Sequence, residues 1–250
     1  MTISTLIQKA KDNWRPNRYA LVPYPVRDGK KHPFAVICPG GGYNVVCSYV
    51  EGKPFAEALN AMGYSAFVVY YRTKKKAGYP HPQEDLKRAI TEITALAGEW
   101  DLDPYGWSLW GSSAGGHLAA SFCTEERGTP KPAALILCYP VITMGALTHG
   151  QTRDNLLGKD ADPAMIGRMS VERNIRPDFP PTYAWYGTAD TSVNPENSRM
   201  LERALTAAGV PHRVEAYEGV GHGAGLAAGT NAGPWLGQAV AFWEEQRRRK

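Results

Sequence analysis

The chain has 250 residues, of which 43% are hydrophobic and 21% charged, and 28 Lys and Arg against 24 Asp and Glu give a net charge of +4. This length and composition are typical of one globular α/β domain with a substantial core. The small net charge carries no nucleic-acid-binding signature, so we expect no nucleic-acid partner.

The first 42 residues lead from an edge strand to a glycine-rich loop. Residues 19–24 are interpreted as the edge strand, and the apolar run 34–38 as a strand buried on both faces. Pro39-Gly40-Gly41-Gly42 follows it directly. Either this run is a flexible turn, or it leaves the N–H groups of Gly41 and Gly42 free to face a cleft, which we favour.

The next part of the chain alternates helix and strand. Residues 51–62 are amphipathic and end before Gly63, which suits a helix with a glycine C-cap. Residues 65–71 form another apolar run, typical of a buried strand. Residues 83–100 have helical spacing, and Pro82 suits the first turn of that helix.

A Gly-x-Ser-x-Gly motif lies at the centre of the chain. The aromatic and apolar segment 105–110 predicts a strand, and Gly111-Ser112-Ser113-Ala114-Gly115 follows it and opens an apolar helix. In this context the motif indicates a nucleophilic serine, Ser113, on a strained turn between strand and helix. The Ala114 N–H, with those of Gly41 and Gly42, would form an oxyanion hole.

After the predicted strand at 133–139, the alternation is interrupted. Residues 141–181 mix polar residues with short helical pieces. We interpret them as a small cap-like insertion over the carboxyl edge of the sheet, within a single domain that covers residues 1–250. No long apolar lid segment occurs in this insertion, which argues against a lipase for long acyl chains.

The last third of the chain supplies an acid and a base. Asp190 follows the predicted strand 182–186 and precedes a helix at 195–209, and His222 follows the predicted strand 213–217. Helix-period residues at 230–248 close the chain. A serine hydroxyl needs an adjacent base, and that base needs an orienting acid. The order Ser113, Asp190, His222 is the chain order of α/β-hydrolases.

Other acids and histidines are poorer candidates for these roles. His212 precedes its strand and so lies at the opposite edge of the sheet, and His117 lies within the helix after Ser113. The competing acids all fall in the presumed insertion: Asp154, Asp160, Asp162 and Asp178. Alternating strands and helices predict an α/β-hydrolase fold, with a mostly parallel sheet covered by helices on both faces.

The sequence resembles the α/β-hydrolase-fold carbohydrate esterases, in the acetylxylan or feruloyl esterase-like branch related to hormone-sensitive-lipase-like esterases. The matching motifs are Pro39-Gly40-Gly41-Gly42-Tyr43, Tyr71-Arg72, Pro80-x-Pro82-x-x-Asp85, Gly111 to Ala119, Asn155 to Gly158, Pro180-Pro181-Thr182, Gly187-x-x-Asp190 and Gly221-His222-Gly223. The resemblance implies the same triad and oxyanion donors, and a structural pairing of Arg72 with Asp85. Pro39 departs from the histidine that often braces this loop in related lipases.

No metal or other cofactor is expected, because Cys38, Cys47, Cys123 and Cys138 form no Cys-x-x-Cys or Cys/His pattern. No apolar stretch is long enough to cross a membrane. Residues 1–18 lack the apolar core of a signal peptide. We therefore expect a cytoplasmic protein, although the mature form of a secreted protein would have the same sequence.

These patterns predict a serine esterase that cleaves short acyl groups, acetyl above all, from sugars or xylo-oligosaccharides. Tyr43, Trp185 and Trp235 are candidates for stacking on a sugar, or equally core residues. Two alternatives use the same scaffold: an amidase, formamidase or peptidase with the same triad, and a non-catalytic binding protein.

Overall fold

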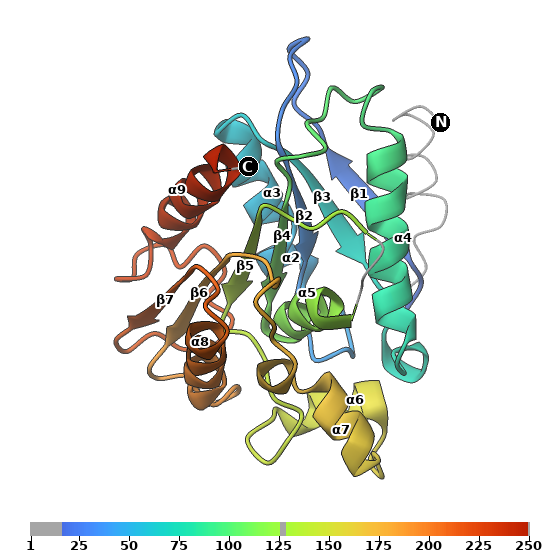
Figure 1. Ribbon diagram of the computed structural model, residues 1–250, viewed down its shortest axis with the longest axis vertical. Coiled ribbons are helices and arrows are strands. Elements are labelled where there is room, and N and C mark those ends of the chain that lie inside the picture. Colours follow the sequence, from blue (N-terminus) through green and yellow to red (C-terminus); the bar gives the residue numbers. More distant parts are fainter. Residues whose placement is uncertain (1–16, 126–128, 250) are drawn as a thin grey trace.

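The structure, a computed structural model, describes residues 17–125 and 129–249 (Figure 1). Most of the N-terminal segment on which the absence of a signal peptide was predicted, residues 1–16, therefore lies outside the described residues. So does Lys250, at the end of the chain. Within the described residues, no helix is both long and apolar enough to cross a membrane.

A seven-stranded sheet forms the centre of the described structure, in the order β1-β3-β2-β4-β5-β6-β7. The strands are β1 (Ala20–Tyr24), β2 (Phe34–Cys38), β3 (Ser65–Tyr70), β4 (Ser108–Ser112), β5 (Ala134–Cys138), β6 (Thr182–Gly187) and β7 (His212–Tyr217). Only the edge pair β1–β3 is antiparallel, and every other neighbouring pair is parallel. The predicted α/β-hydrolase architecture is confirmed.

Helices cover both faces of this sheet (Figure 1). They are α2 (Ser48–Glu51), α3 (Lys53–Ala61), α4 (His81–Ala95), α5 (Ser113–Glu125), α6 (Gly150–Leu157), α7 (Pro163–Met169), α8 (Glu196–Ala207) and α9 (Trp235–Arg248), with short 3₁₀ turns η1 (Lys74–Lys76) and η2 (Val171–Arg173). α4, α5 and α8 share one hydrophobic core with one face of the strands, and α3 and α9 share another with the opposite face.

The side chains of β2 pack alternately into the two hydrophobic cores on the opposite faces of the sheet. Phe34, Val36 and Cys38 pack into the core under α4 and α5, whereas Ala35 and Ile37 pack into the core under α3 and α9. Successive strand side chains point to opposite faces, so a strand covered on both faces has to be apolar throughout. This is why the five residues of β2 read as a continuous apolar run and are all buried.

Several predicted element ends differ from the structure. The helix predicted at 51–62 is divided into α2 and α3 at Gly52, whose added Cβ would lie 2.6 Å from the Ser48 hydroxyl. β4 begins at Ser108 and not at Tyr105, which is 84% exposed and outside the ladder that starts at the Ala35–Ser108 pair. The last helix begins at Trp235, later than predicted, with Pro234 as its N-cap.

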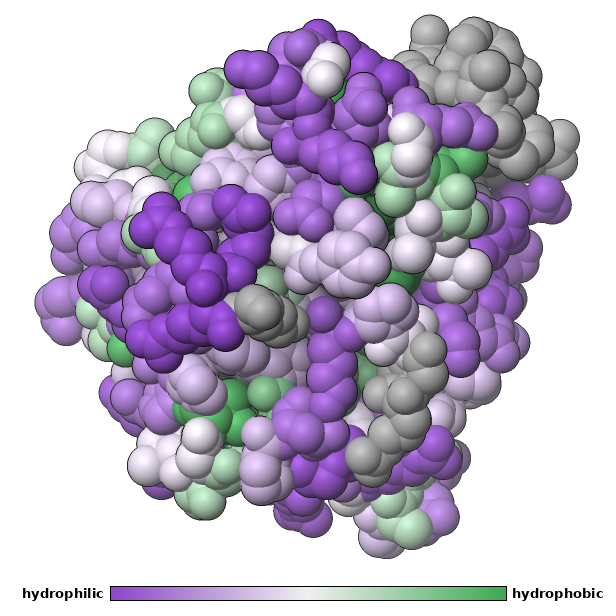
Figure 2. All heavy atoms as spheres, turned by 45° about the horizontal axis from the view of Figure 1, so that its top comes forward, coloured by the Kyte–Doolittle hydropathy of each residue, from purple (hydrophilic) through white to green (hydrophobic). Residues whose placement is uncertain are grey.

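The segment 141–181 contains α6, α7 and η2. α6 and α7 lie beyond the carboxyl ends of the strands, at the bottom of Figure 1. The view in Figure 2 brings the opposite end of the molecule forward. That face is mainly hydrophilic, with small and separate hydrophobic patches.

The contact between α5 and the end of β2 gives a stability prediction. A Cβ added to Gly115 in α5 would overlap the backbone carbonyl oxygens of Cys38 and Pro39, whereas one added to Gly237 in α9 would meet nothing within 4 Å. We expect Gly115→Ala to lower the free energy of unfolding by about 2–4 kcal/mol, because backbone has to move. Gly237→Ala should raise it by about 0.5–1 kcal/mol through helix propensity.

Urea unfolding of the two variants beside the parent protein measures both changes. Since the substitution is the same and both sites are helical, opposite signs isolate the steric contact at Gly115. Equal effects at the two positions would contradict this account of the packing.

Candidate active site

Ser113 lies at the turn from β4 into α5, in a backbone conformation that serine rarely adopts. Its φ is 52°, in the left-handed region that costs energy for any residue with a Cβ. Two glycines permit this turn: an added Cβ on Gly111 would overlap the Gly115 carbonyl, and one on Gly115 would overlap the end of β2. The turn therefore holds the Ser113 hydroxyl at the carboxyl end of the sheet, as the motif predicts.

The structure brings Ser113, His222 and Asp190 into one hydrogen-bonded row. His222 Nε2 lies 2.8 Å from Ser113 Oγ, and His222 Nδ1 lies 2.7 Å from Asp190 Oδ2. A carboxylate only accepts hydrogen bonds, so Nδ1 carries the proton and donates it to Asp190. Nε2 is then unprotonated and accepts the hydrogen bond of the Ser113 hydroxyl, as required of a general base.

The loop between β6 and α8 fixes the carboxylate of Asp190. Oδ1 accepts hydrogen bonds from the backbone N–H groups of Ser192 and Val193, both at 2.9 Å, which leaves Oδ2 for His222. The Asp190 side chain is 2% exposed, against 21% for His222. The acid is thus buried and oriented, while the base stays open to solvent on one side.

The glycine loop after β2 presents free backbone donors next to Ser113. Gly41 and Gly42 have φ of 121° and 61°, which favour glycine. Within the described residues their N–H groups donate no hydrogen bond, whereas the Gly40 N–H donates to Glu51 Oε2 at 2.6 Å. Ala114 is the second residue of α5, where an N–H has no intrahelical acceptor. Their joint role as an oxyanion hole stays a prediction.

Other contacts brace this loop in place of the histidine that Pro39 replaces. Tyr71 donates its hydroxyl to the Pro39 carbonyl at 2.6 Å, and the Asn155 amide donates to the Gly42 carbonyl at 2.8 Å. Glu51 binds the Gly40 N–H. Asn155 was noted in the sequence only as part of the matching motif Asn155 to Gly158, without a role. Glu51 was not identified, because it does not stand out from an ordinary polar helix residue.

His117 joins the glycine loop to the segment 141–181. Its ring is completely buried, Nε2 lies 2.8 Å from the Met169 carbonyl, and Nδ1 lies 2.9 Å from the Tyr43 hydroxyl. Because a carbonyl only accepts, Nε2 carries the proton and Nδ1 accepts from Tyr43. Burial lowers the pKa of His117 to about 4, so the ring is neutral at physiological pH.

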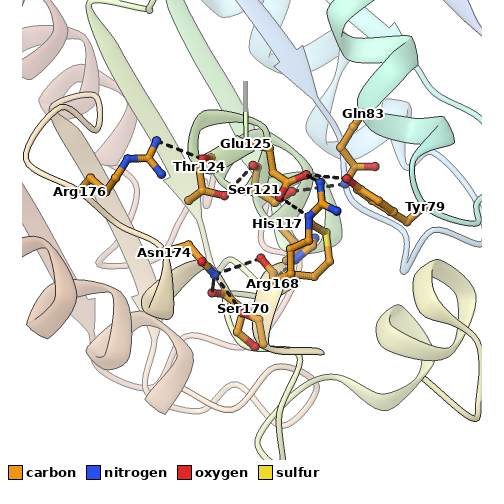
Figure 3. A network of polar contacts seen from close by, with 12 residues as sticks. Tyr79, Gln83, His117, Ser121, Thr124, Glu125, Arg168, Ser170, Asn174 and Arg176 are labelled. Atoms are coloured by element: carbon orange, nitrogen blue, oxygen red, sulfur yellow. Dashed lines mark hydrogen bonds and ion pairs between the residues drawn. The ribbon is translucent and has the colours of Figure 1, made fainter. Parts of the chain in front are cut away.

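A polar network attaches α7 and the segment that follows η2 to α5 (Figure 3). Arg168 makes a two-pronged ion pair with Glu125, which also accepts the Tyr79 hydroxyl at 2.6 Å. Arg176 donates to the Thr124 carbonyl at 3.2 Å. Paired contacts of this kind fix geometry as well as adding energy. The insertion is therefore tied to the helix that begins at Ser113.

The prediction that Tyr43, Trp185 and Trp235 stack on a sugar is wrong, because all three side chains are 0% exposed. Tyr43 donates to His117, and the other two rings pack against each other with centroids 5.5 Å apart. Their role is in the core. The pairing of Arg72 with Asp85, in contrast, is present: Arg72 Nε lies 2.9 Å from Asp85 Oδ2.

Residues of α6 and the loop before it lie at the mouth of the site. A Cβ on Gly42 would lie 3.3 Å from Gln151 Oε1 and 3.8 Å from His149 Cε1. Burial lowers the pKa of His149, and the nearby His222 lowers it further. Within the described residues, no three His, Cys, Asp or Glu side chains cluster closely enough to hold a metal ion.

Two open cavities lie near the site, one beside His222 and the other beside Asn155. One, of about 450 Å³, is lined by His222 and by residues near it in the sequence, namely Glu218 to Gly221, Ala224, Thr230 and Asn231. The other, of about 470 Å³, is lined by Lys74, Lys75, Asp154 and Asn155 together with apolar side chains. Asn155 also binds Gly42, so this second cavity adjoins the glycine loop.

Comparison with known proteins identifies relatives across most of the chain. A family model described as BD-FAE matches residues 22–205. Endo-1,4-beta-xylanase B of Butyrivibrio fibrisolvens is 29% identical over 97% of this chain and 42% of its own length. The acetylxylan esterase of Xylanibacter ruminicola is 30% identical over 75% of this chain and 40% of its own length. The chain thus spans about two fifths of these curated relatives.

A solved structure extends the likeness to three dimensions. The acetyl ester-xyloside bifunctional hydrolase from Caldicellulosiruptor lactoaceticus superposes with a TM-score of 0.84 at 32% identity, covering 93% of this chain and 89% of that one. Its similarity therefore extends over nearly the whole of both chains.

The buried, neutral His117 makes stability depend on pH. Its folded pKa of about 4 lies below the ordinary value of 6.5. Between these pH values the unfolded chain binds a proton that the folded protein does not, so the free energy of unfolding decreases as the pH falls. We expect this residue to cost the protein about 2–3 kcal/mol between pH 7 and pH 4.5.

Urea unfolding at both pH values, on the parent protein and on His117→Gln, measures this cost. Glutamine can donate to Met169 and accept from Tyr43 but does not titrate, and every other histidine is common to both proteins. The same pH dependence in parent and variant would show that His117 is not the group responsible.

Proposed function

This chain belongs to the BD-FAE family, and from that membership and the row Ser113–His222–Asp190 we propose that it is a serine esterase acting on short acyl esters of sugars. The observation that carries the proposal is the 2.8 Å contact between His222 Nε2 and Ser113 Oγ, with the base oriented by a buried Asp190. A serine on a strained turn with a positioned base is the arrangement that activates a hydroxyl for attack on an ester.

In the acylation step, His222 Nε2 takes the proton of the Ser113 hydroxyl as Oγ bonds to the ester carbonyl carbon. The negative charge that develops on the carbonyl oxygen is stabilised by the N–H groups of Gly41, Gly42 and Ala114. His222 then gives its proton to the departing alcohol oxygen as the C–O bond breaks. This leaves the acyl group on Ser113.

Deacylation repeats these steps with water as the nucleophile. His222 takes a proton from water while the water oxygen bonds to the acyl carbon, and it returns that proton to Ser113 Oγ as the acid leaves. Asp190 stays ionised and stabilises the imidazolium in both halves of the reaction.

A sugar ester as substrate is supported by the relatives and by the second cavity. One relative carries the name acetylxylan esterase, and the structural neighbour that of an acetyl ester-xyloside hydrolase. The cavity next to the glycine loop offers Lys74, Asp154 and Asn155, whose polar groups suit the hydroxyls of a sugar. We therefore propose a short acyl group, acetyl above all, on a small-molecule or oligosaccharide alcohol.

Ser113→Ala tests the nucleophile, and Ser121→Ala in the same helix is its matched control. Ser121 is buried and bonds the Leu118 carbonyl, away from the triad. We expect Ser113→Ala to lower kcat for p-nitrophenyl acetate by about 10⁴-fold or more, because no covalent intermediate can form. Ser121→Ala should stay within a few-fold of the parent protein.

The substrate is tested by acetate release from acetylated xylan and by turnover of p-nitrophenyl acetate, butyrate and octanoate and of the matching anilide. We expect acetate release, a rate that falls with acyl length, and little amide cleavage. Activity on aryl esters without acetate release from xylan would reject the sugar; faster amide than ester turnover would favour an amidase.

Asp190→Asn tests how the acid acts. The asparagine oxygen would take the two backbone donors of Asp190 Oδ1, so its NH₂ group would face His222 Nδ1. That contact favours the tautomer with the proton on Nε2, which then donates to Ser113 and cannot act as base. We expect kcat to fall by about 10³–10⁴-fold with the fold intact, as judged by circular dichroism. Wild-type rates in this variant would contradict the proposed role.

A further inference from the structure

Glu51 is a buried acid to which the proposed mechanism assigns no role. It is the last residue of α2 and is 4% exposed. Among the residues that the structure describes, no Lys or Arg side chain forms an ion pair with it. A buried carboxylate without a cation is costly unless hydrogen bonds compensate, so its hydrogen-bond partners define what it does.

Those partners lie on both sides of the active site. Glu51 Oε2 accepts the Gly40 N–H at 2.6 Å, and Oε1 accepts the Tyr139 hydroxyl at 2.8 Å. The Tyr139 oxygen in turn accepts the Gly225 N–H at 3.1 Å. A backbone N–H can only donate and an ionised carboxylate can only accept, so Gly40 and the Tyr139 hydroxyl both donate to Glu51, and Gly225 donates to Tyr139.

This series of hydrogen bonds ends at the two loops that the proposed reaction requires, the glycine loop at Gly40 and the loop of His222 at Gly225. Gly40 precedes the proposed oxyanion donors, and its added Cβ would lie 2.8 Å from both Glu51 Oε2 and Ser113 Cβ. Gly225 lies three residues after His222, and a Cβ there would lie 2.9 Å from Val50 Cγ1 in α2. α2 therefore contacts the glycine loop and the histidine loop at once.

Tyr139 also touches the base directly. Its ring lies against the His222 ring with centroids 4.9 Å apart at 67°, an edge contact. Its φ of 39° places it among the left-handed non-glycine residues, immediately after β5. Tyr139 thus connects Glu51 to His222 through packing as well as through the Gly225 hydrogen bond.

Glu51 also interacts electrostatically with His222. Burial raises the pKa of Glu51 above its ordinary value, and its two hydrogen bonds and the charge of His222 offset part of that rise. The other titratable groups that interact electrostatically with Glu51 are neutral at pH 7, because burial raises the pKa of each. They are Cys47, Tyr71, Cys138 and Tyr139. An imidazolium at His222 and a carboxylate at Glu51 therefore stabilise each other.

We propose that Glu51 is a positioning residue that fixes the glycine loop after β2 relative to the loop that carries His222 and Gly225. Its negative charge also favours the imidazolium that forms on His222 during acyl transfer. This proposal rests on the proposed esterase function. It assigns Glu51 no contact with the substrate; the residue acts through Gly40, Tyr139 and His222.

Glu51→Gln is the central variant, and Glu57→Gln on the exposed side of α3 is its control. The amide keeps the volume, and its oxygen can still accept from Gly40, but its NH₂ group can only donate, so the Tyr139 hydroxyl loses its acceptor and the negative charge is lost. We expect kcat for p-nitrophenyl acetate to fall about 10–100-fold with KM nearly unchanged, since the alignment matters most in the transition state. The acid limb of the pH profile of kcat/KM should move to lower pH, because the imidazolium has lost a nearby negative charge.

Tyr139→Phe separates positioning from charge. It breaks the bonds of the Tyr139 hydroxyl to Gly225 and to Glu51 Oε1, but leaves the carboxylate and its bond to Gly40. We expect a smaller fall in kcat, about 3–20-fold, with the acid limb close to that of the parent protein. Unchanged kcat and an unchanged acid limb in Glu51→Gln would overturn the proposal. If that variant does not fold, unchanged kcat in Tyr139→Phe would do so.

A fluorophosphonate probe distinguishes this failure from failure of the proposed function. The probe labels an activated serine without needing the natural substrate, so its rate of reaction reports on Ser113, His222 and the oxyanion donors, and not on the sugar. Equal labelling rates in the parent protein and Glu51→Gln, with both hydrolysing esters equally, reject the role of Glu51 only. No labelling and no ester hydrolysis in the parent protein reject the esterase itself.

Discussion

The geometry of the site depends on one close contact within the main chain, where the backbone of α5 packs against the backbone at the end of β2. At Gly115 the helix passes the carbonyls of Cys38 and Pro39 too closely for any Cβ. This contact places the first turn of the helix, with Ser113 and the Ala114 N–H, directly against the glycine loop that follows β2. Ser113 and the glycine loop are about 70 positions apart in the sequence, and this steric contact brings them together.

Buried polar groups also hold the loops around that contact. Asp190, Glu51 and His117 are each buried, and each joins segments that are far apart in the sequence. Such groups are costly unless every partner is in place. The arrangement therefore favours one geometry of the site over alternatives in which a loop is displaced and a buried group loses its partner.

Sequence patterns predicted the sheet, the helices that cover it and the three residues that the structure brings into one hydrogen-bonded row, because each depends on local chemistry. Continuous apolar runs mark strands covered on both faces, and Ser113, Asp190 and His222 each follow a strand. What failed was the assignment of single residues to core or surface: Tyr43, Trp185 and Trp235 are entirely buried. An aromatic residue has the same local pattern in both settings, and only the packing of distant segments decides between them. Glu51 escaped notice for the same reason, since its partners Gly40, Tyr139 and Gly225 span most of the chain.

The attachment of the segment 141–181 has a consequence for how a substrate would reach Ser113. If the segment moved away from α5, the bidentate ion pair of Arg168 with Glu125 would break. The buried His117 would also lose its hydrogen bond to the Met169 carbonyl. A substrate that needed this segment to move in order to reach Ser113 would therefore have to offset the loss of a charge-assisted ion pair and of a buried hydrogen bond.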